Sequence, residues 1–291
     1  TETVLRQALK EYVRPTLFIN KVDRLIREVK LTPEEMQKKF INIIDSVNEL
    51  IAKIAPKDFK GKWQLSVSDG SVAFGSAFHN WALSLKFMKE KNISFKDIIE
   101  HYNPEEPEKY KKLSKLAPLH EVVLSMVADH LPSPLIAQKY RVPNIWHGEP
   151  ESAEGKSLTS CDANGEPAFI CTKIVMDPHA GEVAAGRMYS GTLKQGDEVY
   201  LNMAKRNLRL QQVSVYKGSQ RIQVDKVVAG NIVGLVGLKG IFSGETVSKN
   251  PMEPFESIKH IFEPVVTKSI EAEKSSDLAK LIEVLRKVSK E

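Results

Sequence analysis

The stretch PTLFINKVDR, residues 15–24, combines a short apolar run with an abrupt polar ending. The apolar part, residues 16–19, is typical of a strand that is buried on both faces of a parallel sheet. The polar part is Asn20-Lys21-Val22-Asp23. Ligands of open α/β sheets bind just outside the carboxyl ends of the strands, which is where this tetrapeptide is expected to lie. The stretch therefore predicts an α/β domain with a candidate site at the end of one strand.

The tetrapeptide has two interpretations. Polar residues that follow a strand can simply begin a loop, and short motif matches also arise by chance. The alternative is a site that reads the edge of a purine. An ionised Asp23 only accepts hydrogen bonds, whereas guanine donates from a ring N–H and a neighbouring amine, a pair that adenine lacks. We therefore favour guanine recognition by Asp23, with the stem of Lys21 lying over the base and Asn20 bracing the loop.

A later strand-like piece ends in Gly75-Ser76-Ala77. These residues can form the second half of the site if their loop lies beside the first. These residue types are common in loops and carry little weight by themselves. If the two loops lie close together, a backbone N–H of the second loop can reach the guanine oxygen, because small residues permit close approach. Ser76 and Ala77 are therefore candidate base-contacting residues.

Residues 1–146 show the alternation of helices and strands expected of an α/β domain. Helical spacing covers residues 1–13 and 119–131, and a third helix is expected to begin with a capping box formed by Thr32 and Glu35. Its core face is expected to contain Met36, Phe40, Ile43, Ile44, Val47, Ile51 and Ile54. Two strand-like pieces flank Asp69-Gly70 and predict a hairpin, and residues 78–117 are interpreted as a charged helical insertion.

The rest of the chain changes character twice. Residues 147–164 are rich in Gly, Pro, Ser and Glu, which predicts a linker. Seven or so β-branched runs with glycine-rich turns follow in residues 165–253 and predict a closed antiparallel barrel. In residues 254–291, PVVTKSIEA is expected to form a strand, and Ser276 is expected to cap a helix with an apolar stripe. One strand and one helix cannot bury that stripe alone, so a third domain is expected to begin here.

The net charge of +5 is concentrated in one segment, because residues 183–226 contain eight basic and three acidic side chains. A localised basic surface favours a polyanionic partner, and a solvated charged face explains the composition equally well. The candidate residues for facing RNA or a ribosome are Arg187, Lys194, Lys205, Arg206 and Arg209.

Several motifs are absent from the sequence. It contains no G-x-x-x-x-G-K-[ST] phosphate loop, and its seven histidines show no metal-ligand spacing. The D-x-x-G spacing of Asp162–Gly165 lies in the predicted linker, and we interpret it as coincidence. No catalytic residue and no metal site are therefore predicted in this chain.

The composition, with 42% hydrophobic and 27% charged residues, is that of a soluble globular protein of two or three domains. No run of eighteen apolar residues is present, so no membrane span is expected. Cys161 and Cys171 suggest neither a metal knuckle nor a disulfide framework, and the polar start at Thr1 is not a signal peptide. A cytoplasmic location is expected, and the missing initiator methionine indicates a piece of a longer protein.

Seven stretches resemble the translational GTPases, and specifically the elongation factor two family of archaea and eukaryotes. They are TETVLRQAL, NKVDR, FGSAFHNWA, HLPSPLIAQKYRV, GRMYSGTLKQGDEVYL, AGNIVGLVGLKG and PVVTKSIEAEKSSDLAKLIEVLRKVSK. The bacterial counterpart of that family, elongation factor G, shares some of these stretches. The resemblance runs nearly from end to end.

The resemblance implies both a fold and residue roles. It implies the C-terminal part of a P-loop-type GTPase domain, then a β-barrel that docks on small-subunit ribosomal RNA, then the start of a ferredoxin-like α/β domain. Asn20, Lys21 and Asp23 match the family's guanine-specificity motif, and Ser76 and Ala77 match its second base-contacting loop. Family members carry the phosphate loop and switch segments upstream, so this chain is expected to be an internal piece that binds no nucleotide tightly.

The expected parent is a GTPase that drives the movement of tRNA and mRNA through the ribosome, with GTP or GDP and Mg²⁺ as its ligands. The piece itself is expected to hydrolyse no GTP above background. Two alternatives stay open: a non-catalytic ribosome- or RNA-binding module, and another translational GTPase such as a release or ribosome-protection factor. Salt-dependent RNA binding favours the module, whereas saturable and guanine-selective GDP binding favours a nucleotide pocket.

Overall fold

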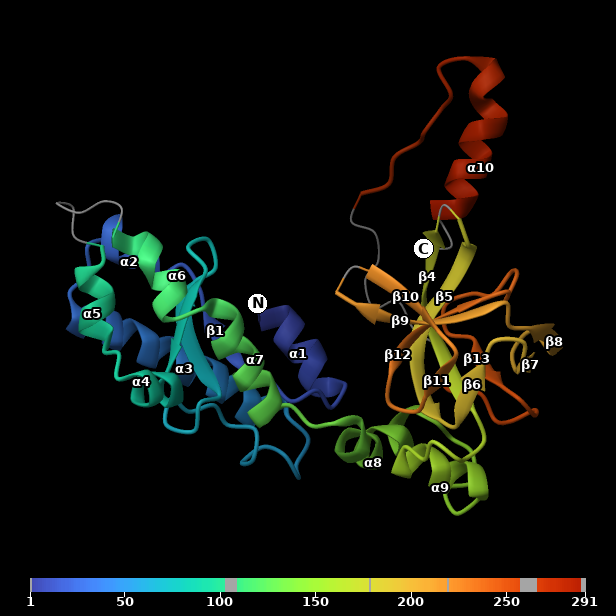
Figure 1. Ribbon diagram of the computed structural model, residues 1–291, viewed down its shortest axis with the longest axis horizontal. Coiled ribbons are helices and arrows are strands. Elements are labelled where there is room, and N and C mark those ends of the chain that lie inside the picture. The colour runs from blue at the N-terminus through green and yellow to red at the C-terminus, as the bar shows by residue number, and fades with distance from the viewer. Residues whose placement is uncertain (1, 103–108, 178, 219, 257–265, 289–291) are drawn as a thin grey trace. The chain divides into compact units, whose positions relative to one another are not determined.

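The computed structural model describes residues 2–102, 109–177, 179–218, 220–256 and 266–288 (Figure 1). The chain divides into two compact units, Thr1–Pro132 and Ser133–Glu291. The predicted domain boundary at residue 146 is therefore too late. Within the described ranges, no helix combines the length and the apolar composition needed to cross a membrane.

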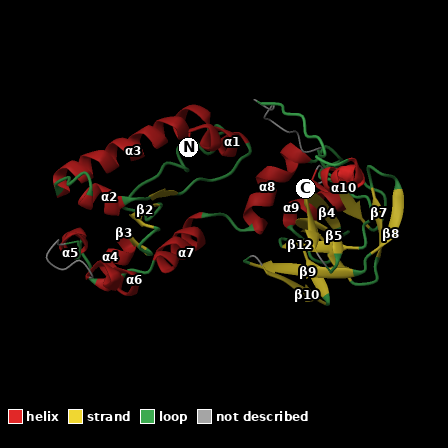
Figure 2. Ribbon diagram, turned by 90° about the horizontal axis from the view of Figure 1, so that it is seen from above, coloured by secondary structure: helices red, strands yellow, loops and turns green. Residues whose placement is uncertain are grey.

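The first unit is an α/β domain with a small mixed sheet. Its strands are β1 (Leu17–Ile19), β2 (Val72–Ser76) and β3 (Trp81–Ser84); β2 pairs in parallel with β1 and antiparallel with β3. Figure 2 shows this sheet between α3 on one side and α6 and α7 on the other. The helical elements of the unit are α1 (Glu2–Lys10), α2 (Val22–Arg27), α3 (Pro33–Ile54), α4 (Leu85–Lys91), α5 (Phe95–Glu100), the 3₁₀-helix η1 (Lys109–Lys112), α6 (Leu113–Leu116) and α7 (Leu119–His130).

Helix α3 confirms the predicted capping box and core face. The Glu35 N–H donates to the Thr32 hydroxyl at 3.2 Å, and the Thr32 N–H donates to the Glu35 carboxylate at 2.8 Å. Such a cap stabilises a helix by about 1 kcal/mol. Met36 and Ile51 are fully buried, and the Phe40 ring stacks on the Phe74 ring of β2 at 5.5 Å between centroids. The predicted face therefore anchors α3 to the sheet.

The predicted hairpin around Asp69-Gly70 is wrong, because the residues before this turn form no strand. The backbone of Leu65 is bonded instead to the Asn48 side chain of α3: its N–H donates at 2.7 Å, and its C=O accepts at 2.9 Å. The hairpin lies one turn later and joins β2 to β3. Strand β3 thus falls inside the segment predicted to be a helical insertion, where Trp81, Ala82 and Leu83 are all buried.

The second unit is built on antiparallel strands, as predicted. An eight-stranded sheet has the order β10-β9-β12-β5-β4-β13-β7-β8, and β11 pairs separately with β6. No ladder joins β10 to β8 in the described ranges, so the predicted closure is not formed by strand pairing there. The core between the strands includes Phe169, Met188 and Leu235, all fully buried. The strands are β4 (Ala168–Asp177), β5 (Gly181–Ser190), β6 (Thr192–Lys194), β7 (Glu198–Leu201), β8 (Arg206–Arg209), β9 (Gln212–Lys217), β10 (Gln220–Val224), β11 (Lys226–Val228), β12 (Ile232–Val236) and β13 (Thr246–Ser248).

The predicted linker at 147–164 is wrong, because this segment is packed on the sheet. It contains helix α9 (Ala153–Ser160) and follows α8 (Pro134–Ile145), a helix that the sequence analysis did not predict. Leu158 and Trp146 are buried in one cluster with Phe255, and the Trp146 indole N–H donates to the Glu253 carbonyl at 2.8 Å. Glycine here permits close packing, since a Cβ on Gly155 would lie 2.6 Å from the Glu149 carbonyl oxygen. The second unit therefore begins well before the predicted boundary.

The tail confirms the predicted helix but not the predicted strand. Helix α10 (Leu278–Val288) follows the 3₁₀-helix η2 (Ser275–Asp277), so Ser276 lies inside η2 and does not cap α10. Residues 266–272 form no strand, and residues 264–265 of the expected strand lie outside the described ranges. The apolar side chains of α10 are exposed, including Leu278, Ile282, Val284, Leu285 and Val288.

Candidate nucleotide-binding site and basic surface

The loop after β1 and the loop after β2 are joined by one side chain. Asn20 follows β1, and its side-chain oxygen accepts from the Lys21 N–H at 2.8 Å and from the Ala77 N–H at 3.0 Å. Lys21 has a left-handed backbone, with φ of 65°. The hydrogen bond to its own loop holds that uncommon conformation, while the bond to Ala77 holds the second loop beside it. Asn20 therefore joins the two loops, and its place in a guanine site stays a prediction.

The second loop is a tight turn between β2 and β3. Ser76 is fully buried, and its hydroxyl accepts from the His79 N–H at 3.2 Å. Gly75 is required by close approach, since a Cβ there would lie 2.2 Å from the Trp81 carbonyl oxygen. The Ala77 N–H is used by Asn20, whereas the Phe78 N–H donates to no group in the described part of the chain. Ser76 thus shapes the turn, and the contact of Ser76 and Ala77 with a base stays a prediction.

Both loops line one pocket of about 350 Å³. The Asp23 side chain is only 13% exposed, and its nearest polar neighbour is His79, whose Nδ1 lies 4.0 Å from Oδ2. The Asp23 carboxylate accepts no hydrogen bond within the described residues, so both oxygens are open to a ligand that donates. The lining residues are Asn20, Lys21, Asp23, Arg24, Arg27, Glu28, Ser76, Phe78 and His79.

His79 was not predicted from the sequence, where the histidines looked isolated. Its Nδ1 lies 2.9 Å from the Tyr102 hydroxyl oxygen, and that oxygen accepts from the Trp81 indole N–H at 2.7 Å. Burial lowers the pKa of His79 below its ordinary value; the nearby Asp23 opposes this shift, and the positive charge of Arg27 adds to it. The imidazole beside Asp23 is therefore neutral at pH 7. Its position directly after Ser76-Ala77-Phe78 was the only available signal.

The pocket contains few groups of the kind that ligate metal ions. In the described ranges, no three His, Cys, Asp or Glu side chains are grouped so as to hold a metal ion. No residue is therefore assigned to Mg²⁺. The pocket lining contains two carboxylates, those of Asp23 and Glu28, beside Lys21 and Phe78.

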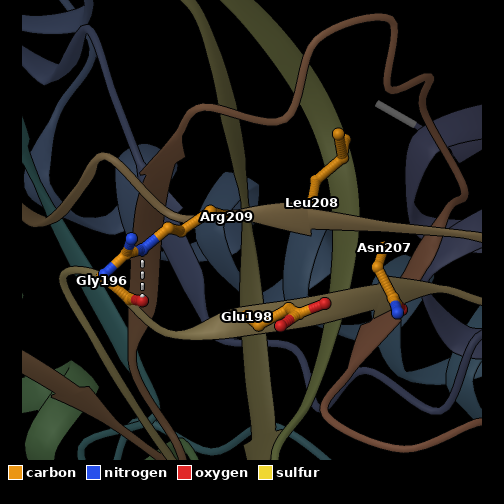
Figure 3. Close-up of a pocket in the computed structure, with 5 residues that line it drawn as sticks. All are labelled: Gly196, Glu198, Asn207, Leu208 and Arg209. Carbon is orange, nitrogen blue, oxygen red and sulfur yellow. Dashed lines mark hydrogen bonds between the residues drawn. The ribbon is translucent and has the colours of Figure 1, made fainter.

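The five predicted basic residues play different parts in the second unit. Arg206 and Arg209 are exposed, but each donates to a backbone carbonyl, Arg206 to Lys239 at 2.6 Å and Arg209 to Gly196 at 2.9 Å. Figure 3 shows the Arg209 bond beside Glu198 and Asn207, in a pocket of about 350 Å³ between β7 and β8. Lys205 is exposed in the turn before β8. Arg187 is partly buried on β5, near Tyr189. Burial raises the pKa of Tyr189, and the positive charges of Arg141 and Arg187 oppose that rise.

Lys194 lies in a second pocket of about 410 Å³, together with Lys226 and Lys249. Lys194 and Lys226 are directly opposite each other on the β6–β11 ladder. Like charges in this arrangement destabilise a sheet, and neither ammonium has an ion-pair partner within the described residues. Lys249 is held by Asp197 at 3.2 Å. Lys226 and Lys249 were not predicted from the sequence, because only the fold brings them beside Lys194.

Two family models match the chain. The elongation factor Tu GTP binding domain matches residues 1–133, and elongation factor Tu domain 2 matches residues 181–248. The first match ends within one residue of the boundary between the compact units at 132 and 133. The second match covers strands β5 to β13 of the second unit.

Curated relatives match over the whole chain. Elongation factor 2 of Thermococcus sibiricus is 56% identical over 291 residues, which is 100% of this chain and 39% of that protein. Elongation factor 2 of Methanocaldococcus jannaschii is 56% identical and that of Methanococcus aeolicus 57%, each over 100% of this chain and 40% of the relative. The chain thus spans about two fifths of the length of these relatives. Together with the two domain matches, this similarity means that the chain belongs to the elongation factor 2 family of translational GTPases.

Proposed function

We propose that the protein containing this chain is a cytoplasmic GTPase that couples GTP hydrolysis to the movement of tRNA and mRNA through the ribosome. Relatives named elongation factor 2 match this chain over its full length. Within that activity, the first unit supplies recognition of the guanine base. The hydrogen bond from Ala77 to Asn20 carries this assignment, because it joins two loops 57 residues apart into one pocket beside Asp23.

The roles within the pocket follow from donor and acceptor chemistry. Asp23 accepts from the ring N–H and the amine of guanine, which excludes adenine. The stem of Lys21 covers one face of the base, and the Phe78 N–H donates to the guanine oxygen. Asn20 and Ser76 hold the two loops in place and make no direct contact with the base.

Hydrolysis depends on groups that cradle the phosphates and Mg²⁺. The sequence contains no phosphate-loop motif, so the residues of this chain are assigned to the base alone. The chain by itself is expected to turn over no GTP above background and to bind GDP weakly. In the whole protein, Mg²⁺ is expected to bind together with the phosphates of the nucleotide.

The test uses the full-length protein and the 291-residue chain side by side. Fluorescent GDP is titrated into each, and GDP, ADP and XDP compete with it. The full-length protein should bind GDP saturably, prefer it to ADP, and hydrolyse GTP when ribosomes are added. ADP competing as well as GDP, or ribosomes leaving hydrolysis at the background rate, would reject the proposed function.

The pocket of Lys194, Lys226 and Lys249 favours a second, compatible function for the second unit, which is docking on ribosomal RNA of the small subunit. Two ammonium groups that lie directly opposite each other, with no ion-pair partner among the described residues, cost stability, and a phosphate between them removes the cost. Arg206 and Arg209 on β8, and Lys205 just before it, add three further exposed positive charges to this unit. Binding to small subunits that weakens steeply with salt supports this docking; binding that salt does not change argues against it.

The exposed stripe of α10 supports a third proposal, that this helix belongs to an α/β domain of ferredoxin type. Leu278 and Val288 are 52% and 60% exposed, far more than a packed helix allows. Amides of α10 should be protected from hydrogen exchange in the full-length protein and unprotected in the isolated chain. Equal protection of these amides in the full-length protein and in the isolated chain would reject this proposal.

A further inference from the structure

The Tyr102 hydroxyl lies between two side chains near the nucleotide pocket. Tyr102 follows α5 and is 8% exposed, and Trp81 at the start of β3 is fully buried. The Tyr102 oxygen is 2.7 Å from Trp81 Nε1 and 2.9 Å from His79 Nδ1. Tyr102 lies in the segment between β3 and α7, so a residue of that segment touches the wall of the pocket.

The direction of these hydrogen bonds follows from what each group can do. An indole N–H only donates, so the Tyr102 oxygen is the acceptor of the bond from Trp81. Its own proton is then available for His79 Nδ1, which accepts it as the lone pair of a neutral imidazole. This network assigns the imidazole proton to Nε2. The buried position of His79 favours the same neutral form.

His79 Nδ1, the atom that accepts from Tyr102, also faces Asp23 and lies 4.0 Å from its Oδ2. A proton on that nitrogen would turn the imidazole into a cation beside the carboxylate. A charge-assisted hydrogen bond would then form and occupy the oxygen that guanine requires. The other charged groups around the pocket are Lys21, Arg24, Arg27 and Glu28. Arg27 disfavours the cation, whereas Asp23 favours it.

We propose that Tyr102 is a positioning residue for guanine recognition, whose hydroxyl keeps Nδ1 of His79 an acceptor and thereby leaves the Asp23 carboxylate free for the base. The inference rests on the proposed role of the pocket in guanine binding. It gives the segment between β3 and α7 a part in nucleotide selectivity. No contact between Tyr102 and the nucleotide is required.

The first experiment compares GDP affinity of full-length wild-type protein and Tyr102→Phe between about pH 6 and pH 8.5, the range in which an ordinary imidazole titrates. Phenylalanine keeps the ring and removes only the hydroxyl. We expect the two proteins to agree within about twofold at the high end, and the variant to bind about tenfold more weakly at the low end, which corresponds to about 1.4 kcal/mol. Tyr200→Phe, a tyrosine on β7 in the other unit, is the matched control and should behave as wild type.

A second pair of variants tests the same idea at His79. His79→Gln cannot take up a proton, so Tyr102→Phe combined with His79→Gln should lose the added pH dependence. His79→Lys places a permanent cation at a side chain that is 7% exposed beside Asp23. It should weaken GDP binding about tenfold or more relative to His79→Gln at every pH in the range.

Each outcome decides the proposal. A Tyr102→Phe defect of equal size at all pH values means a purely structural role and overturns it, as does the absence of any defect. If Tyr102→Phe fails to fold, His79→Lys decides, and binding as tight as that of His79→Gln overturns the proposal. Failure of the guanine pocket itself is recognised separately, because wild-type protein would then not prefer GDP to ADP.

Discussion

The side-chain oxygen of Asn20 lies 3.0 Å from the backbone nitrogen of Ala77 and joins the two loops of the pocket. Asn20→Ala removes this bond and leaves the left-handed Lys21 without its local acceptor. A typical hydrogen bond contributes about 0.5–1.5 kcal/mol, so GDP affinity of the full-length protein should fall about threefold to tenfold. Fluorescent GDP titration measures the change. Asn42→Ala, on the exposed face of α3, should leave the affinity unchanged.

Asp23→Asn should change which base is bound. An amide can donate to the carbonyl that xanthine carries in place of the guanine amine, and it no longer offers two acceptors. GDP affinity should fall at least about 100-fold, and XDP should become the preferred ligand. Competition between the two nucleotides in the full-length protein measures the preference. Glu28→Gln, which removes a charge from the same pocket, is the control, and an unchanged preference in Asp23→Asn would remove Asp23 from its role.

Phe78→Ala should weaken nucleotide binding without changing the choice of base. The Phe78 ring is 87% exposed at the rim of the pocket, where it can stack on a bound base. Base–aromatic stacking contributes about 1–3 kcal/mol, so the affinity should fall about fivefold or more. The same factor should apply to XDP bound by the Asp23→Asn protein, because stacking does not read the base edge. Leu124→Ala, an exposed apolar residue on α7, is the control; a loss confined to guanine would contradict stacking.

Leu158→Ala should destabilise the second unit, because the segment once interpreted as a linker is part of its core. Leu158 is fully buried in the cluster with Trp146 and Phe255. A cavity of this kind costs about 2–5 kcal/mol. Urea unfolding gives the free energy, and hydrogen exchange should show the loss in α8 and α9. Lys156→Ala on the exposed face of α9 should cost much less, and equal costs for the two variants would restore the linker interpretation.

Lys194→Gln and Lys226→Gln should each weaken binding to small subunits and flatten its salt dependence. Each phosphate contact contributes about 0.7–0.9 to the slope of log affinity against log salt, so each variant should lower the slope by about that amount. The isolated variants should not be less stable than wild type, since each removes a like-charge pair. Lys217 is an exposed lysine at the end of β9, and Lys217→Gln is the control that shows whether the effect is specific to the pocket. A loss as large in that control would indicate a diffuse charge effect.

Local signals in the sequence predicted elements whose stability is itself local. The capping box of Thr32 and the 3.6-residue spacing fix α3 without reference to the rest of the chain. The motif at Asn20 to Asp23 likewise placed a pocket at the end of β1, because strand ends are where side chains leave a sheet. The antiparallel strands of the second unit followed from β-branched runs and glycine turns.

Elements that depend on distant partners were missed. Leu65 has its backbone bonded to Asn48 of α3, which no pattern near Leu65 can reveal. The glycines at 148 and 155 resemble linker residues, but they are needed where backbone and the Trp146 ring come too close for a Cβ. His79, Tyr102 and Lys249 act through partners from other elements or loops. Their roles were invisible until the fold placed them together.

Gly75 limits which substitutions the turn between β2 and β3 can accept. A single methyl group at position 75 would meet the Trp81 carbonyl oxygen at 2.2 Å and the Ala82 Cα at 2.7 Å, so β3 would be pushed away from β2. The turn between these strands would follow, and Ala77 would move out of reach of Asn20. A substitution at position 75 would therefore weaken guanine selectivity even if every side chain proposed to contact the nucleotide were unchanged.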